Sequence, residues 1–249
     1  MKFSKEDIEY LQGNKFSNGL KLLISHKECS VPTRMEHVED IVKNKNIIHV
    51  GFADHIPLIV KKIKENKWFH KRLVECTKRC LGVDTNKEAV SYCKRLGYVD
   101  IINFDIENDE VPSQISQTKW DYILVAEILE HVSNPAAFLE VVNKKYWNII
   151  DKIIVTVPNA FRFENFQNSR KHMEHINTDH RYWFTPYTLG KIITKAGMKI
   201  EDFQFCQRSS LSKRGLSNYL RYLKLKRYPC FRDTLIMTAK LGYVTNKYA

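Results

Sequence analysis

Short runs of branched and aromatic apolar residues alternate along this chain with segments in which apolar residues recur every three or four positions. The first pattern predicts strands and the second predicts amphipathic helices. A clear helix is residues 134–150, with Pro135 in the first turn, where proline is well tolerated. The strands predicted in the first two thirds of the chain cover residues 46–53, 78–84, 99–106, 120–127 and 151–159.

Strands at this spacing, with helices between them, predict a doubly wound, mostly parallel sheet with helices on both faces, that is, an α/β fold. Residues 185–198 predict another helix, and residues 199–205 and 232–241 predict two more strands. The expected sheet therefore has seven strands.

Length and composition fit one such domain. At 249 residues the chain can bury a full α/β core but has little room for a second one. We expect a helical N-terminal extension over residues 1–45 and one domain over residues 46–249, with a basic insertion at about 208–230.

The N-terminus lacks the apolar stretch of a signal peptide, and no apolar run approaches the roughly 18 residues of a membrane span. The six cysteines do not form the paired spacing of a zinc site. We interpret them as reduced thiols, which predicts a cytoplasmic protein. The sequence does not indicate an oligomeric state.

Positive charge is concentrated near the C-terminus. The net charge is +12, and the residues from Arg208 onward hold ten Lys or Arg against one acid, Asp233. This bias implies an acidic partner, which is a phosphate, a nucleotide, a nucleic acid or an anionic membrane surface.

Polar residues and glycine follow successive predicted strands. Ligands of open parallel sheets bind beyond the carboxyl ends of the strands, and Gly51, Asp84, Asp105 and Glu127 lie there after strands one to four. An ionised carboxylate after strand two can accept hydrogen bonds from two ribose hydroxyls. An aspartate after strand three suits an adenine amino group.

This order of features, with EILEHV after strand four and VPN in strand five, resembles the class I S-adenosylmethionine-dependent methyltransferases over roughly residues 45–240. Over residues 120–140 and 179–198 the chain is similar to the small-molecule and saccharide-type branch of that superfamily. The resemblance implies S-adenosylmethionine as the cofactor. The cofactor-binding positions it implies are Gly51, Ala53, Asp54, His55, Asp84, Thr85, Asp105, Ile106, Ala126 and Glu127.

The first motif departs from the family pattern. His49 replaces the usual acid, Ala53 the second glycine and His55 the third. Histidine cannot freely adopt the conformations of glycine. In one interpretation the loop turns differently and Asp54 or His55 faces the methionine part of the cofactor. In the other, cofactor binding is lost and the protein is a non-catalytic partner protein. The acids after strands two and three favour the first.

Glu127, Glu130 and His131 can face one side of a single helical turn. They are either a capped helix start or the floor of an active site. We favour the active site, with His131 as the base and Glu127 or Glu130 holding its tautomer. His180 is a second catalytic candidate.

Two further segments are expected to bind the acceptor. The apolar loop after His180 closes the cleft, and the basic segment receives an anionic group of the acceptor. The substrate-binding candidates are Arg181, Tyr182, Trp183, Arg214 and Arg221.

A metal-dependent alternative uses overlapping residues. Glu127, Glu130, His131 and His180 resemble the magnesium site of the small-RNA 3′-terminal 2′-O-methyltransferases. Mg²⁺ there would lower the pKa of an acceptor hydroxyl.

Three functions remain open. The favoured one is O-methylation of an anionic small molecule, such as a phosphate-bearing or nucleotide-activated sugar or a surface-saccharide precursor. The second is RNA 2′-O-methylation, supported by the basic tail, although no separate RNA-binding module is recognisable. The third is the non-catalytic partner protein.

Overall fold

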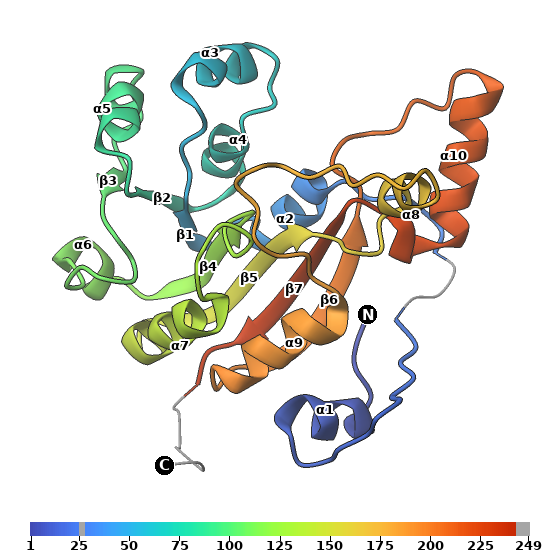
Figure 1. The fold of residues 1–249 in the computed structure, drawn as a ribbon. Coiled ribbons are helices and arrows are strands. Elements are labelled where there is room, and N and C mark those ends of the chain that lie inside the picture. Colours follow the sequence, from blue (N-terminus) through green and yellow to red (C-terminus); the bar gives the residue numbers. More distant parts are fainter. Residues whose placement is uncertain (25–27, 243–249) are drawn as a thin grey trace.

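A seven-stranded sheet forms the centre of the computed structural model, which describes residues 1–24 and 28–242 (Figure 1). The strand order is β3-β2-β1-β4-β5-β7-β6, and β7 lies antiparallel between β5 and β6. The predicted α/β fold is therefore confirmed. The strands are β1 (Asn46–Val50), β2 (Arg79–Asp84), β3 (Ile101–Asn103), β4 (Trp120–Ala126), β5 (Ile150–Pro158), β6 (Lys199–Cys206) and β7 (Thr234–Lys240).

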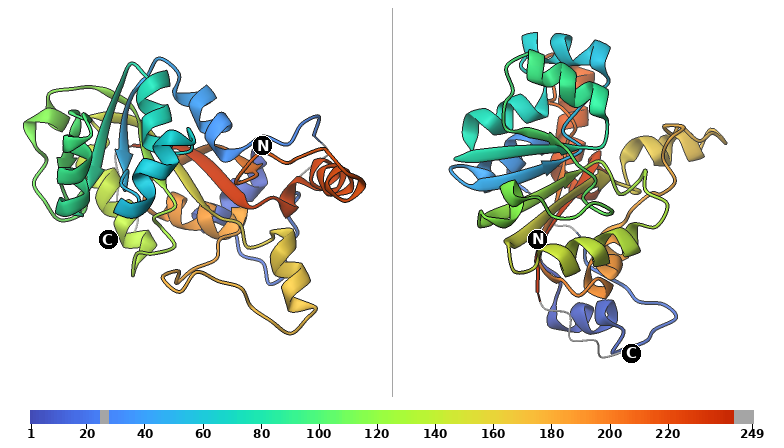
Figure 2. Two further views of the ribbon diagram at one scale, coloured as in Figure 1. Left: turned by 90° about the horizontal axis from the view of Figure 1, so that it is seen from above. Right: turned by 90° about the vertical axis from the view of Figure 1, so that its left-hand side faces the viewer.

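Helices cover both faces of the sheet (Figure 2). On one face α7 and α9 pack over the centre of the sheet, and on the other face α2 and α4 do so. The helices are α1 (Lys5–Gln12), α2 (Arg34–Val42), α3 (Ile56–Lys64), α4 (Phe69–Cys76), α5 (Lys87–Arg95), α6 (Ser113–Ser116), α7 (Pro135–Tyr146), α8 (Phe163–Ser169), α9 (Pro186–Lys195), α10 (Leu216–Arg227) and the 3₁₀ turn η1 (Pro229–Phe231).

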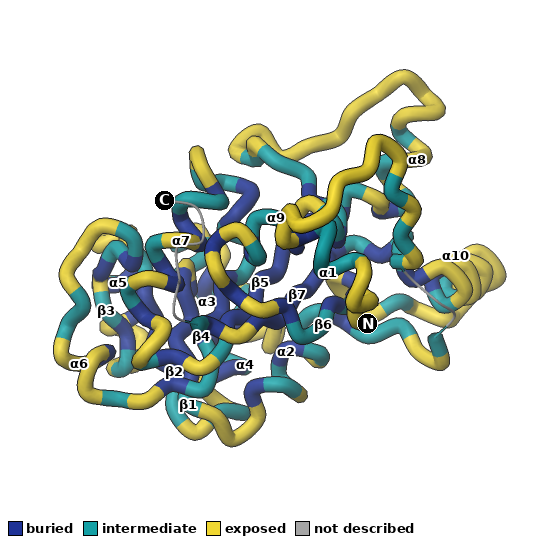
Figure 3. Tube along the Cα trace, turned by 90° about the horizontal axis from the view of Figure 1, so that it is seen from below, coloured by how far each residue is buried: buried dark blue, intermediate teal, exposed yellow. Residues whose placement is uncertain are grey.

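Burial on both faces explains why the central strands are almost continuously apolar. In β1, Ile48 and Val50 face the α7 and α9 side, whereas Ile47 faces α2 and α4. The tube in Figure 3 shows the contrast between the buried strands and the exposed helices α8 and α10. None of the helices within the described residues is both long and apolar enough to cross a membrane.

The segment before β1 packs closely on the sheet domain. It contains α1 and α2, and the described residues between them form no helix. Leu11 of α1 is buried, and Lys191 of α9 donates a hydrogen bond to the Tyr10 carbonyl at 2.6 Å. The amide of Phe203 in β6 donates to the Met1 carbonyl at 2.8 Å. This segment therefore contributes to the core around β6 and α9.

Candidate active site

The loop after β1 needs glycine at one position. Gly51 has φ +66°, and its amide donates to the Val83 carbonyl at 2.8 Å. A Cβ at this position would lie 2.8 Å from Cδ1 of Ile128, which is closer than real Cβ contacts. The backbone of β1 therefore turns directly beneath the loop that follows β4.

The other substituted positions of this loop do not require glycine. His55 precedes α3 with φ −53°, an ordinary conformation for any residue. The Ala53 amide donates to Asp84 Oδ2 at 3.0 Å, and Asp54 pairs with Lys62 at 2.6 Å. The loop thus follows another path, in which histidine at position 55 is unstrained.

The pKa values of the two acids after β2 and β3 shift in opposite directions. Asp84 accepts hydrogen bonds from the amides of Ala53 and Asn86, but its burial raises its pKa. Burial would also raise the pKa of Asp105, yet hydrogen bonds from Asn108 and Glu107 lower it overall. Both acids therefore help to shape the loops at this edge of the sheet.

Three further residues that the sequence suggested for cofactor binding lie at the same edge of the sheet. Thr85 is exposed directly after β2, and Ala126 ends β4. Ile106 is buried, and its carbonyl accepts a hydrogen bond from the Tyr146 hydroxyl at 3.2 Å. The backbone after β3 is therefore fixed from the α7 side.

The segment after β4 is a tight turn and not the helical turn expected from the sequence. Glu127 has φ +55°, a region that non-glycine residues seldom adopt. The amide of His131 donates to the Ile128 carbonyl at 2.9 Å, and α7 begins only at Pro135. Such local strain is often found at functional sites.

The turn separates Glu127 from the other candidate ligands. Its carboxylate lies 3.4 Å from Arg34 and accepts a hydrogen bond from the Thr156 hydroxyl at 3.1 Å. It lies outside the group of potential metal ligands that the described residues form. Glu127 thus anchors the turn to α2 and β5.

The sequence alone did not indicate that Arg34 belongs to the candidate site. Arg34 is the first residue of α2, and its amide donates to the Gln207 carbonyl at 2.8 Å. A topological signal existed, because a helix that leads into β1 starts at the carboxyl edge of the sheet. Only the fold shows that Arg34 meets Glu127 there.

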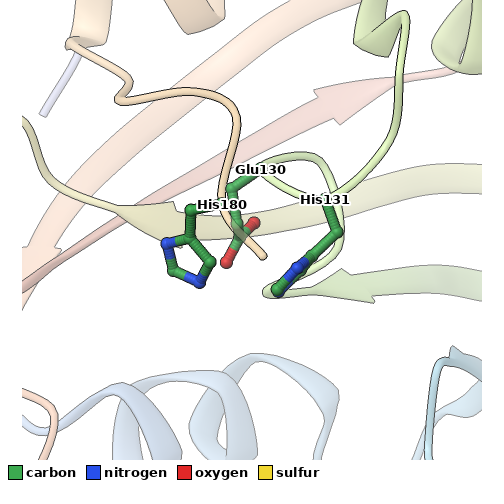
Figure 4. A group of neighbouring side chains, drawn as sticks. All are labelled: Glu130, His131 and His180. Carbon is green, nitrogen blue, oxygen red and sulfur yellow. The ribbon is translucent and has the colours of Figure 1, made fainter. Parts of the chain in front are cut away.

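Glu130, His131 and His180 form the centre of the candidate site. One ligand atom from each lies within 4.8 Å of the others. The carboxylate of Glu130 lies between the two imidazoles (Figure 4), whose ring centroids are 4.6 Å apart. Nδ1 of His131 lies 3.2 Å from the Asp179 carbonyl, so it carries the proton and donates. The backbone at Asp179, and not a glutamate, therefore holds the tautomer of His131.

The electrostatics of this trio favour an added cation. Burial, and then the charge of Glu127, raise the pKa of Glu130 to about 8. Neither of its carboxylate oxygens has a hydrogen-bond partner among the described residues. Burial and then His131 lower the pKa of His180. A proton or a metal ion would compensate this buried carboxylate.

The predicted acceptor-binding loop is tied to the turn after β4. Arg181 donates its amide to the Glu130 carbonyl at 2.7 Å and its guanidinium to Ser133 Oγ at 3.1 Å. The Tyr182 hydroxyl donates to the Ser133 carbonyl at 2.7 Å. Trp183 stacks beneath Arg162 at 4.8 Å. These contacts position His180 beside His131.

Only one of the two basic candidates lines a cavity. Arg221 of α10 lines a cavity together with Arg162 and Arg208. Arg214 is exposed in the loop before α10 and is not among the residues that line this cavity.

Comparisons with known proteins give the fold. No protein-family model and no curated protein sequence matches the chain. Small RNA methyltransferase HEN1 superposes with a TM-score of 0.54 at 13% identity, over 92% of this chain and 28% of that chain. Magnesium protoporphyrin IX methyltransferase (ChlM) from Synechocystis PCC 6803, with bound S-adenosylhomocysteine, gives 0.51 at 10% identity, over 84% of this chain and 82% of that chain.

A third match is a proposed methyltransferase in complex with the Haloferax volcanii Trm112 methyltransferase activator. Its TM-score is 0.50 at 14% identity, over 84% of this chain and 94% of that chain. The chain therefore has the fold of the S-adenosylmethionine-dependent methyltransferases.

Proposed function

We propose that the protein is an S-adenosylmethionine-dependent O-methyltransferase that acts on an anionic small molecule, such as a phosphate-bearing or nucleotide-activated sugar or surface-saccharide precursor. The observation that carries this proposal is the carboxyl edge of the sheet. Gly51, Asp84 and Asp105 follow β1, β2 and β3, and Glu130, His131 and His180 gather after β4.

The residues at this edge fit the cofactor. Gly51 takes the positive φ that this loop needs, and Ile128 packs directly against it, so the backbone after β1 is held in a tight turn at this edge. Asp84 accepts hydrogen bonds from the amides of Ala53 and Asn86, and a carboxylate retains acceptor capacity for a ribose hydroxyl. Asp105 and Ile106 lie where the adenine would bind.

When bound, the cofactor supplies the methyl group, and the chain must align the acceptor and take its proton. His131 is suited to this role, because Nδ1 donates to the Asp179 carbonyl and Nε2 keeps its lone pair. The ring of His180 lies beside that of His131, with 4.6 Å between centroids.

The trio also fits a divalent cation. Its donors are one carboxylate and two imidazoles, and the oxygens of Glu130 are buried without a hydrogen-bond partner among the described residues. This donor set suits manganese, iron, cobalt or zinc better than magnesium, which prefers oxygen ligands. A cation held there would lower the pKa of an acceptor hydroxyl.

RNA 2′-O-methylation is the second candidate function, since the C-terminal segment is strongly basic and its Arg208 acts electrostatically on Glu130 and His180. The salt dependence of acceptor binding separates the two. Several phosphate contacts to RNA give a steep loss of affinity with salt, whereas a small phosphate-bearing acceptor gives a shallow one.

The proposal is tested with methyl-labelled S-adenosylmethionine and a panel of sugar phosphates and nucleotide sugars. His131→Ala should reduce turnover by about 10²–10⁴-fold, because a general base is lost, and should leave cofactor affinity unchanged. His172→Asn, a change at an exposed histidine, is the control. Absence of transfer to every panel member would contradict the proposed substrate class.

Chelation separates the base from a metal mechanism. If a cation acts, dialysis against EDTA abolishes turnover, and adding manganese restores it more fully than adding magnesium. If His131 acts alone as the base, turnover survives chelation.

A further inference from the structure

A polar cavity of about 280 Å³ lies between the start of α8, the loop after β6 and α10. Figure 1 shows α8 and α10 together beyond one end of the sheet. Three arginines and two acids contribute to its wall. The lining residues that matter here are Arg162, Glu164, Arg208, Asn218, Arg221 and Asp233.

The acids of this cavity and one of its arginines already have partners. Arg162 is 7% exposed and donates to Asn165 Oδ1 at 2.8 Å, and its guanidinium lies 3.6 Å from Glu164. Asp233 accepts hydrogen bonds from the side chain of Gln207 and from the backbone amide of Arg208. These contacts build the wall of the cavity, in which the three arginines exceed the two acids by one positive charge.

The guanidinium groups of Arg208 and Arg221 make no hydrogen bond or ion pair within the described part of the chain. Both residues are exposed and line the same cavity, which Asn218 and several serines complete with further donors. Planar guanidinium forks bind phosphate oxygens in pairs. The chemistry of this wall therefore fits a phosphate or diphosphate group.

A groove of about 840 Å³ with polar and apolar walls adjoins the cavity and shares Glu164, Arg221 and Asp233 with it. Its walls come from α8, α10 and η1 and include Phe163, Leu216, Leu220 and Phe231. Leu216 is 75% exposed and Leu220 is 54% exposed. Leucines exposed in a groove beside a cationic cavity indicate a ligand that is both anionic and apolar.

The cavity lies close to the trio. Burial raises the pKa of Glu130, and the charge of Arg208 opposes this rise. Burial lowers the pKa of His180, and the charges of Arg208 and Arg162 add to that effect. Arg208, which lines the cavity, therefore also acts electrostatically on two of the proposed catalytic groups.

We propose that Arg208 and Arg221 bind a phosphate or diphosphate group of the acceptor, and that the groove between α8 and α10 binds an apolar chain or ring attached to that group. The acceptor is then an amphiphilic phosphate ester, for example a sugar phosphate linked to a lipid. This inference rests on the proposed function only in taking the bound molecule to be the methyl acceptor.

Binding of three probes to the full chain tests the subsite by calorimetry, with the alkyl probes below their micelle concentrations. Octyl phosphate should bind at least about tenfold more tightly than inorganic phosphate or neutral octyl glucoside. Its phosphate occupies the cavity and its alkyl chain occupies the groove, whereas each of the other probes occupies only one of the two. Arg208→Ala and Arg221→Ala should each weaken octyl phosphate about tenfold or more, through loss of a charge-assisted hydrogen bond.

Two further variants complete the test. Leu220→Ser should weaken octyl phosphate and leave inorganic phosphate unchanged. Arg214→Ala removes the same charge from the same segment but lines neither cavity, so its affinities should equal those of the wild type.

Equal losses in Arg214→Ala and Arg221→Ala would overturn the subsite, because they would indicate unspecific attraction by the basic segment. Equal affinities for inorganic phosphate and octyl phosphate would overturn the apolar half. None of these measurements needs S-adenosylmethionine. A protein that binds octyl phosphate as expected but transfers no methyl group would therefore contradict the proposed function alone.

Discussion

His49 and His70 form a buried pair behind the loop that contains Gly51. Their Nδ1 atoms are 3.3 Å apart, so one ring donates and the other accepts. Burial, then the charge of His70, hold the pKa of His49 well below its usual value, and burial lowers the pKa of His70 to about 3. The ring of Phe52 packs on His70 with 4.6 Å between centroids. A neutral pair thus occupies the position where the family pattern has an acid.

This pair predicts a loss of stability in mild acid. Both pKa values are lower in the folded protein than the ordinary value of about 6.5, so the unfolded state binds more protons below that pH. The stabilisation is present above pH 6.5 and is lost as the pH falls from there toward 3. Each histidine contributes up to about 1.4 kcal/mol per pH unit to the loss.

Urea unfolding at pH 7.5 and 5.5 measures this effect in the wild type and in a His49→Val, His70→Phe double variant. The variant should lose clearly less stability between the two pH values. Equal losses in the two proteins would contradict a neutral buried pair.

At the scale of elements, the strands were predictable and the docking of the N-terminal segment was not. Strands buried on both faces leave a local apolar signature, and each predicted strand is found within a few residues of its expected limits. The contact of α1 with α9 depends on residues about 180 positions apart, such as Tyr10 and Lys191. Such a long-range contact leaves no local sequence pattern, so residues 1–45 predicted only a polar helical extension.

The docking of α1 predicts unequal effects of two leucine substitutions. Leu11 is 1% exposed, and its side chain approaches α9 at Gly190, whereas Leu23 is 80% exposed. Leu11→Ala should lower the free energy of unfolding by about 2–5 kcal/mol, because it leaves a cavity. Leu23→Ala should stay within about 0.5 kcal/mol of the wild type. Equal stabilities of the two variants in denaturant titrations would show that α1 is not part of the core.

The turn after β4 shows why the site itself was only partly predictable. Sequence spacing grouped Glu130 with His131, and the resemblance to the small-RNA 2′-O-methyltransferases added His180. The structure places the three side chains side by side. Sequence spacing also predicted a helical turn that would add Glu127. The positive φ of Glu127 and its contact with Arg34 send that carboxylate elsewhere, and both depend on tertiary packing.

At the scale of the whole molecule, the strand order concentrates the chemistry at one edge of the sheet. The ends of β1, β2, β3 and β4 lie next to one another, so residues up to 80 positions apart converge there. Sequence order sufficed for this prediction, since parallel strands share their carboxyl edge. The cavity at Arg208 and Arg221 could not be predicted, because its walls come from three separate segments. Arg208 and Arg221 of the basic C-terminal segment place positive charge in this cavity, where it would attract an anionic acceptor.

The central claim is that this edge binds S-adenosylmethionine, and calorimetric titration with S-adenosylhomocysteine tests it most directly. The wild type should bind S-adenosylhomocysteine. Asp84→Ala should lose about 1.5–3 kcal/mol of binding free energy, because its hydrogen bonds to the ribose are lost. This loss corresponds to a more than tenfold lower affinity. Asp151→Ala, at the start of β5 on the opposite edge, should bind like the wild type. Absence of binding to the wild type, or unchanged affinity in a folded Asp84→Ala protein, would contradict the account.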